Sequence, residues 1–292
     1  MKSLTIISGK GGTGKTSIVA SFASLFDNIV LADADVDAAD LHLVIPYETK
    51  KTVEFFAGHK AIINEEICTN CGDCLERCQY EAISSNFTID PVACEGCGVC
   101  VHFCPSNAID FPERKCGEWF VSDTSFGPMV HAKLGIAEEN SGLLVSTVRK
   151  EAKEIAEKEN RDLVLTDGPP GIGCPVIASI TGSTAVLIIT EPTLSGMHDL
   201  KRVAELASFL KVPGMICVNK FDLNPDMTEK IIEASKQYKL TDVGKIPYDP
   251  SVIQAMVEGL SSINYSKGPA SLAIEAVWKN VKNFLNNIPK GV

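Results

Sequence analysis

The fold of this chain is decided by the stretch Ser8-Gly-Lys-Gly-Gly-Thr-Gly-Lys-Thr-Ser17, which separates two segments of different character. Residues 4–8 are apolar and predict a short strand, whereas residues 17–26 have the apolar spacing of a helix. From Gly9 to Thr16 the stretch satisfies the pattern G-x4-G-K-T. A strand, a glycine-rich turn and a helix in this order predict a loop that binds the phosphates of a nucleotide.

Each residue type in this loop has a chemical reason to be there. Glycines let the backbone N–H groups wrap around the phosphates, and the following helix adds the positive end of its dipole. We expect Lys15 to reach the terminal phosphates and the Thr16 hydroxyl to bind Mg2+. The residues expected to contact the bound nucleotide here are Gly11, Gly12, Thr13, Gly14, Lys15, Thr16 and Ser17.

Beyond the loop, apolar strand-like segments alternate with helix-like segments. Helices are expected at residues 146–160 and 200–210. Strands are expected at residues 28–33, 118–124, 129–134, 162–166, 185–190, 214–219 and 242–246, with a turn at Gly127-Pro128. Continuous apolar strands that alternate with helices predict an α/β fold, in which a mostly parallel sheet is flanked by helices on both faces.

A second motif is a doubled run of cysteines with the spacing C-x2-C-x2-C-x3-C. An offset of 26 residues superposes the first run on the second and also Ala82-Ile83 on Ala108-Ile109, so the chain contains an internal repeat. Bacterial-type ferredoxins use this spacing to hold two [4Fe-4S] clusters, and the fourth cysteine of each run binds the other cluster. Zinc sites and disulfide frameworks use different spacings and are disfavoured.

The crossing rule divides the eight cysteines between two clusters. One cluster is assigned Cys68, Cys71, Cys74 and Cys104, and the other is assigned Cys94, Cys97, Cys100 and Cys78. Pro105 follows Cys104 as the pattern expects, but Gln79 follows Cys78. We expect residues 64–110 to form a small α+β ferredoxin-like insert, and residues 1–63 and 111–292 to form the nucleotide-binding domain.

Composition excludes some classes of function. The 292 residues are 45% hydrophobic, enough for a substantial core, and carry a net charge of -10. Nucleic acid is therefore not expected as a partner, because phosphate neutralisation needs a basic surface. We find no signal peptide and no apolar run of the ~18 residues that cross a bilayer, so stable membrane insertion is not expected. Reduced cysteines favour the cytoplasm.

The segment Lys10-Gly-Gly-Thr-Gly-Lys-Thr16 resembles the deviant Walker A motif of the MinD/ParA/Mrp/nitrogenase-iron-protein class of P-loop ATPases. Residues 31–37, LADADVD, resemble the switch I segment of this class, and residues 165–173, LTDGPPGIG, resemble its switch II segment. With the cysteine repeat, the chain is most similar to MinD-superfamily ATPases that carry an inserted ferredoxin domain.

This resemblance implies roles for individual residues. Lys10 would reach the nucleotide of a facing subunit in a homodimer that sandwiches ATP, and Asp35 would orient the attacking water. Lys10, Lys15 and Asp35 would thus be the catalytic residues. Asp33 would support the Mg2+ shell, and Asp167 would contact Mg2+ through water or sense the γ-phosphate. The implied activity is Mg2+-dependent ATP hydrolysis that is slow without a partner.

The recognition of the base is less clearly encoded. Residues 219–222, Asn-Lys-Phe-Asp, match the N-K-x-D pattern with which GTPases recognise guanine. The resemblance instead favours ATP, with Asn219 and Lys220 on one side of the base and residues 247–249, including Pro247 and Asp249, on the other.

Three functions are compatible with these motifs. In the favoured one, nucleotide-dependent rearrangement of a dimer is coupled to electron transfer from the two clusters to a partner protein. In the alternative, the protein assembles or matures an iron-sulfur or metal cofactor on a client metalloprotein. A MinD-like positioning ATPase is the third. The first two use the same residues, and the sequence does not separate them.

Overall fold

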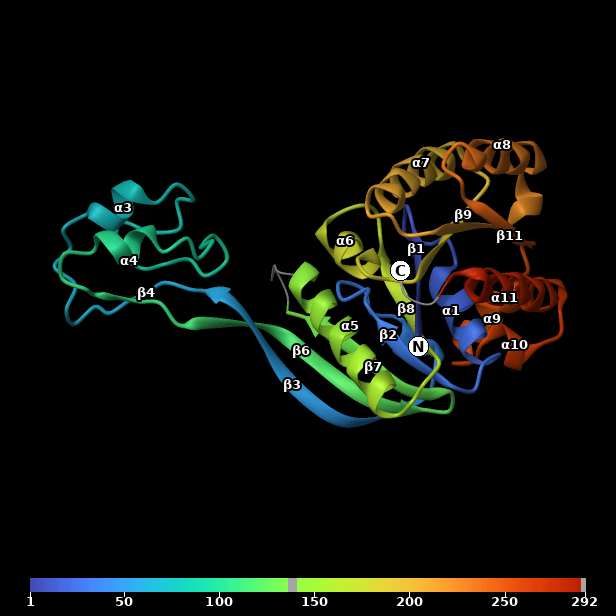
Figure 1. Ribbon diagram of the computed structural model, residues 1–292. Helices are drawn as coiled ribbons and strands as arrows, with labels where there is room; N and C mark the ends of the chain where they lie inside the picture. The colour runs from blue at the N-terminus through green and yellow to red at the C-terminus, as the bar shows by residue number, and fades with distance from the viewer. Residues whose placement is uncertain (136–140, 290–292) are drawn as a thin grey trace. The chain divides into compact units, whose positions relative to one another are not determined.

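The computed structural model describes residues 1–135 and 141–289 (Figure 1). The chain divides into two compact units. The first comprises Met1–Val53, Trp119–Lys133 and Ser141–Val292, and the second comprises Glu54–Glu118 and Leu134–Asn140. Residues of both units occur in β3 (Tyr47–His59), in β6 (Glu113–Thr124) and in the strand that ends at Leu134.

In the described residues the main sheet has nine strands in the order β11-β10-β9-β1-β8-β2-β7-β6-β3. Strand β1 pairs in parallel with β8 and β9, β2 with β7 and β8, and β10 with β9 and β11. The bounds not yet given are β1 Lys2–Ser8, β2 Ile29–Asp33, β7 Gly127–Leu134, β8 Leu163–Pro170, β9 Ala185–Thr190, β10 Gly214–Asn219 and β11 Thr241–Ile246. The predicted α/β fold with a mostly parallel sheet is confirmed.

Helices cover both faces of this sheet, because the strands are apolar on both sides. In β1, Leu4 and Ile6 join one buried apolar cluster with α1 and α11, whereas Ile7 joins a second cluster with α6 and α7. The helices of the first unit are α1 Lys15–Ala23, α2 Leu41–Val44, α5 Ser141–Lys158, α6 Cys174–Ile180, α7 Leu194–Phe209, η1 Phe221–Leu223, α8 Pro225–Lys236, α9 Pro250–Val257, α10 Ser262–Tyr265 and α11 Pro269–Asn287.

The last helix, α11, packs on the sheet with its apolar face. Ile274, Val277 and Val281 are buried at a spacing of three to four residues, as an amphipathic helix requires. Trp278 lies between them, with its ring centroid 4.7 Å from that of Phe22 in α1. Across the residues that the structure describes, no helix is both long enough and apolar enough to cross a membrane.

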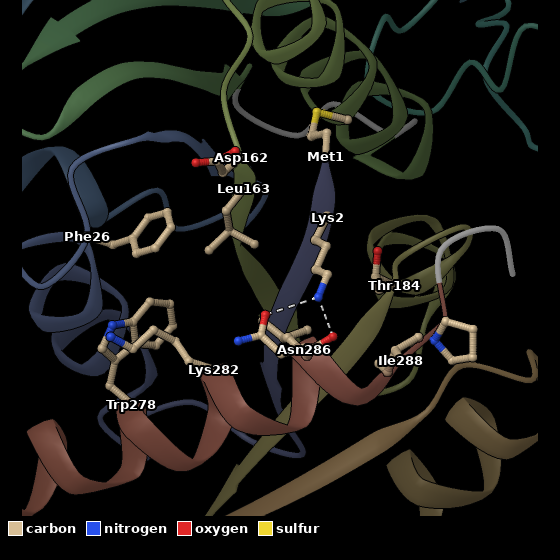
Figure 2. A pocket seen from close by; sticks show the side chains of 12 residues that line it. Met1, Lys2, Phe26, Asp162, Leu163, Thr184, Trp278, Lys282, Asn286 and Ile288 are labelled. Carbon is tan, nitrogen blue, oxygen red and sulfur yellow. Dashed lines mark hydrogen bonds between the residues drawn. The ribbon is translucent and has the colours of Figure 1, made fainter.

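A cavity of about 580 Å3 lies where β1 and β8 begin, beside α11 (Figure 2). Lys2 extends into it and donates to the carbonyl oxygen of Leu285 and, at 3.3 Å, to Oδ1 of Asn286. These bonds join the first strand to the last helix. Because strands β1 and β8 are parallel, this cavity is at the opposite end of both strands from the glycine-rich loop.

In the second unit, the two cysteine runs adopt matching conformations. Helices α3 (Asp73–Arg77) and α4 (Val99–Phe103) each follow a glycine with positive φ, 88° at Gly72 and 73° at Gly98. A short antiparallel pair joins β4 (Ile62–Ile63) to β5 (Ile109–Asp110), and a bridge joins Ile83 to Ile89. These pairings are related by the offset of 26 residues seen in the sequence, since 63 and 109 correspond to 89 and 83.

Two local expectations differ from the structure. The turn predicted at Gly127-Pro128 lies instead at residues 125–126, and β7 already begins at Gly127. The sequence also gave no indication of β3, because residues 47–52 are polar and exposed along one long strand. The insert boundary of 64–110 stays a prediction, although the second compact unit extends further, to Glu54 and Glu118.

Candidate nucleotide and cluster sites

The predicted nucleotide residues meet at the carboxyl ends of the parallel strands. The glycine-rich loop follows β1, Asp33 ends β2, Asn219 ends β10, and Pro247 follows β11. Asp167 in β8 is the register partner of Asp33. Ligands of open parallel α/β sheets bind at this edge, so the topology explains why residues so distant in sequence come together.

The glycine-rich loop depends on backbone conformations that favour glycine. Gly12 and Gly14 have φ of 78° and 84°, in the left-handed region, and Gly14 immediately precedes α1. A Cβ on Gly14 would lie 2.5 Å from Nδ2 of Asn219. Nδ2 of Asn219 donates to the carbonyl oxygen of Thr13 at 2.8 Å. This bond connects the end of β10 to the glycine-rich loop and stabilises the loop.

A cavity of about 420 Å3 lies over this loop. It is lined by every loop residue predicted to contact nucleotide, together with Asp35, Asn219, Lys220, Pro247 and Asp249. Tyr248, which lies within the expected range 247–249, also lines the cavity, and sequence reasoning missed Val252, Ile253 and Met256. The last three are on α9, and they give one wall of the cavity an apolar surface suited to the face of a nucleobase.

Lys15 is surrounded by carboxylates. Its Nζ lies 2.5 Å from Oδ1 of Asp167 and 3.5 Å from Oδ2 of Asp35. The Lys15 and Asp167 side chains are only 7% and 1% exposed, so water screens this pair weakly. With Asp33, one cation faces three carboxyl groups, and the site has more acidic than basic groups.

Burial, more than repulsion between the carboxyl groups, shifts the protonation equilibria of Asp33 and Asp35. Burial, followed by repulsion from Asp167, raises the pKa of Asp33 well above its ordinary value. Burial also raises the pKa of Asp35, to about 6, against the opposing attraction of Lys15. Burial alone would lower the pKa of Lys15, but its attraction to Asp167 and Asp35 outweighs that effect and raises the pKa.

The fit to a divalent cation can be judged from one orphaned atom. Oδ2 of Asp167 is buried and accepts no hydrogen bond. A buried carboxylate oxygen without a donor is costly, and hydrated Mg2+ supplies the donors and the positive charge that this group needs. Thr16 and Lys15 line the same cavity. These donors are hard oxygens, the type that Mg2+ prefers.

Asp33 is placed differently from the other two acids. It is fully buried, and its two oxygens accept from the backbone N–H groups of Asp35, at 3.2 Å, and of Leu41, at 3.1 Å. The carboxylate thus closes the segment from Asp35 to Leu41 into a loop. In this position it shapes the loop that carries Asp35. Like Asp167, and unlike Asp35, it does not itself line the cavity.

Lys10 lies outside the cavity lining, and its Nζ is 3.2 Å from Oε2 of Glu191. Lys220 is within the lining and donates to the carbonyl oxygen of Gly12 at 3.2 Å. Asp222, the last residue of the N-K-x-D match, accepts from the backbone N–H of Tyr248 at 2.7 Å. This bond occupies part of the carboxylate with which a GTPase would recognise guanine.

The eight repeat cysteines line two separate pockets in the second unit. One pocket is lined by Cys68, Cys71, Cys74 and Cys104, and the other by Cys78, Cys94, Cys97 and Cys100. Each pocket takes three cysteines from one run and the fourth from the other. Apolar residues complete the linings, among them Ile63 and Phe87 in the first and Ile83 and Phe111 in the second.

The crossing cysteines receive equivalent backbone bonds. The N–H of Ala82 donates to Sγ of Cys78 at 3.4 Å, and that of Ala108 donates to Sγ of Cys104 at 3.2 Å. Burial would raise the pKa of Cys104, but hydrogen bonds led by that of Ser106 lower it. Such bonds favour a thiolate. Among residues 1–135 and 141–289, no group of three or more His, Cys, Asp or Glu is arranged around a single metal position.

Comparisons with known proteins agree with this geometry. Residues 4–263 match the CobQ/CobB/MinD/ParA nucleotide binding domain. The chain belongs to this family. It is also 34% identical over 285 residues to an uncharacterized protein of Methanocaldococcus jannaschii, with 97% of both chains covered.

Solved structures of MinD proteins share the fold of this MinD/ParA-family chain. The septum site-determining protein MinD of Pyrococcus horikoshii, solved with Mg-ADP, superposes with a TM-score of 0.58 over 99% of both chains, at 15% identity. The cell division ATPase MinD of Pyrococcus furiosus gives a TM-score of 0.58 at 16% identity, covering 97% of this chain and 99% of its own.

The other three cysteines of this MinD/ParA-family chain are outside both pockets. Burial raises the pKa of Cys217 in β10 far above its ordinary value, which makes it an inert core thiol. Cys116 is buried and donates to the carbonyl oxygen of Ala57 at 3.1 Å. Cys174 is exposed at the start of α6.

Proposed function

We propose that this protein is a Mg2+-dependent ATPase whose nucleotide-dependent dimer controls electron transfer from two [4Fe-4S] clusters to a partner protein. The ATPase part is supported by the cavity over the glycine-rich loop, which Lys15 and Asp35 line, and by the Asp35 and Asp167 carboxylates that lie within 3.5 Å of the Lys15 ammonium group. Bound Mg2+ would neutralise the charge that develops on the phosphates. Thr16 and Asp167 would hold it, Asp167 through water.

Within this proposal, nucleotide binding exchanges the partners of Lys15. The ammonium group would leave the Asp167 carboxylate and contact the terminal phosphates, and the freed carboxylate would be available to hold the hydrated cation. Asp35 orients the attacking water at the rim of the cavity, and its pKa of about 6 suits a group that accepts a proton transiently near neutral pH. Hydrolysis is slow until a second subunit or partner aligns these groups.

The nucleotide is proposed to be ATP. The apolar wall of α9 suits a base of either kind, so the discrimination depends on polar groups. Asp222, the residue of the N-K-x-D pattern whose carboxylate would recognise guanine, already accepts a hydrogen bond from the backbone N–H of Tyr248. Tight GTP binding without ATP binding would overturn this assignment.

The cluster part of the proposal is supported by the composition of the two pockets. Each is lined by four cysteines, and the sets coincide with those that the crossing rule assigns. A cubane binds each cysteine through a different iron, so its ligands surround a larger centre than the single tetrahedral ion of a zinc site does. That the cysteines line pockets without converging on one metal position is compatible with a cubane.

Cofactor assembly remains the second candidate, because one observation favours it. Each pocket has an exposed cysteine, Cys71 in one and Cys97 in the other, through which an incoming thiol of a client could displace a ligand. The positioning function has less support, because the apolar face of α11 is buried on the sheet and is not free to bind a lipid surface.

One anaerobic experiment tests the central proposal. Purified protein should contain about eight irons per chain and show a reducible electron paramagnetic resonance signal. Adding Mg2+-ATP should change the rate at which the reduced clusters pass electrons to an acceptor. Stable clusters through many cycles support electron transfer, whereas their quantitative movement to an apo-ferredoxin would establish assembly. Protein that folds and hydrolyses ATP with zinc alone would refute the cluster proposal.

A further inference from the structure

A single carboxylate contacts two lysines, one in the glycine-rich loop and one in the lining of the nucleotide cavity. Glu191 follows β9 directly, and its Oε2 lies 3.2 Å from Nζ of Lys10 while its Oε1 lies 2.5 Å from Nζ of Lys220. Lys10 also donates to Oγ of Ser195 at 3.3 Å. The Glu191 side chain is 13% exposed, whereas that of Lys10 is 34% exposed. Lys10 is therefore folded back against its own subunit.

The backbone that carries Glu191 is fixed by the start of α7. Its carbonyl oxygen accepts from the N–H of Thr193 at 2.8 Å. Gly196 packs so closely that an added Cβ would lie 2.3 Å from this same oxygen. The hydroxyl of Thr190 donates to the carbonyl oxygen of Gly196 at 3.0 Å and closes the turn. The backbone of Glu191 is thus fixed in place. Lys10 contacts the Glu191 carboxylate through a flexible side chain, which can release this carboxylate.

Lys220 is fixed more firmly than Lys10. It has a left-handed backbone, with φ 55° and ψ 37°, and its Nζ is shared between Glu191 and the carbonyl oxygen of Gly12. Residues with side chains adopt this conformation rarely, so the structure around Lys220 must stabilise it. Of the two lysines, Lys10 is the one that can exchange Glu191 for another anion.

We propose that Glu191 retains Lys10 on its own subunit and thereby opposes ATP-dependent dimerisation. The inference rests on the proposed function, in which Lys10 reaches the nucleotide of a facing subunit. Lys10 cannot bind Glu191 and a partner's phosphate at once, so the phosphate must displace the carboxylate. Glu191 is a positioning residue that raises the ATP occupancy needed for assembly. A partly exposed ion pair of this kind changes an equilibrium by up to about five-fold.

The first test does not depend on dimers. In nucleotide-free protein, the acetylation rate of the Lys10 amine is measured by mass spectrometry, with Lys201 and Lys267 as exposed references. Glu191→Gln preserves the size of the side chain and removes its charge. It should increase Lys10 acetylation about two- to five-fold relative to the references. An unchanged Lys10 rate would overturn the retention contact, whatever the function of the protein.

The second test measures assembly. Sedimentation with Mg2+-ATP is done in an Asp35→Ala background, so that hydrolysis does not limit the dimer. Glu191→Gln should tighten dimerisation about two- to five-fold. Glu205→Gln removes a charge from the exposed side of α7 and should leave the dimer constant unchanged. If Glu191→Gln weakens the dimer or leaves it unchanged, the proposal is wrong.

A double-mutant cycle separates retention from a general electrostatic effect. In a Lys10→Ala background, Glu191→Gln should no longer tighten the dimer, whereas a purely electrostatic effect on nucleotide affinity would persist. A Lys220→Ala background should preserve the effect. If the parent protein forms no ATP-dependent dimer, the proposed function fails, and the acetylation result still decides whether Glu191 holds Lys10.

Discussion

The Nζ of Lys15 lies 2.5 Å from Oδ1 of Asp167, so the residue expected to bind phosphate is paired with the residue expected to sense it. Both side chains are almost completely buried. A nucleotide must therefore compete with an internal ion pair before its terminal phosphate reaches Lys15. This competition couples occupancy of the loop to the position of the segment that follows β8.

Lys15→Ala should abolish nucleotide binding and also lower the free energy of unfolding by about 3 kcal/mol, because the buried Asp167 carboxylate loses its counterion. Chemical denaturation and nucleotide titration measure the two effects. The double variant Lys15→Ala with Asp167→Asn should recover most of the stability and none of the binding. Unchanged stability in the single variant would show that Asp167 is neutralised by another group.

Asp35→Asn should stop hydrolysis and stabilise the nucleotide-free protein at pH 7. The pKa of Asp35 is raised in the folded state, to about 6, so the folded protein holds this proton more tightly than the unfolded chain does. Its contribution to stability is therefore complete below pH 4 and is lost as the pH rises through 6. The expected gain at pH 7 is on the order of 1 to 2 kcal/mol.

The measurement for Asp35 is urea denaturation of both proteins from pH 4 to pH 7. The difference in unfolding free energy should grow with pH over this interval and then level off. A difference that does not change with pH would mean that Asp35 titrates normally in the folded protein.

The loss of iron in double cysteine variants should depend on which pocket each cysteine lines, and not on which run it belongs to. Cys78 and Cys100 line the same pocket. The double variant Cys78→Ser with Cys100→Ser should therefore keep about four irons per chain, as each single variant does. Cys78→Ser combined with Cys104→Ser affects both pockets and should lose nearly all iron. Iron analysis under anaerobic conditions measures the outcome. If instead the pair within one run, Cys78 and Cys74, behaved as one site, the crossed assignment would be wrong.

Ile253→Asp should weaken ATP and ADP binding to a similar extent, by about ten-fold, because it places a charge on the apolar wall next to the base. Val257 is on the same helix, is 81% exposed, and does not line the cavity. Val257→Asp is therefore the matched control and should bind nucleotide normally. Equal effects of the two substitutions would place the base elsewhere.

Much of the sheet could be predicted from the sequence because its strands are buried on both faces. Continuous apolar runs gave β9 and β10 with the bounds that the structure has. Strand β3 could not be predicted in this way, since its first six residues are exposed and show no apolar alternation. Apolar periodicity in a sequence arises from burial, and an exposed strand therefore shows little periodicity.

The parts of the candidate site that lie within one short segment could be predicted from the sequence. Contacts between segments far apart in the chain could not. The glycines of the loop predict its conformation. The bond between Asn219 and the carbonyl oxygen of Thr13 could not be predicted, because it joins residues far apart in the chain. The apolar residues of α9 are similar: Val252, Ile253 and Met256 have the spacing of an ordinary packed helix, and only the tertiary structure brings them to the loop.

The exchange of fourth cysteines between the two pockets has an evolutionary consequence. A chain with only one repeat supplies three cysteines to its own pocket and offers its fourth to a pocket that it does not contain. A chain of this kind would complete a four-cysteine pocket only by pairing with a copy of itself. Duplication and fusion would make that pairing intramolecular, and neither repeat could then be deleted without removing cysteines from both pockets.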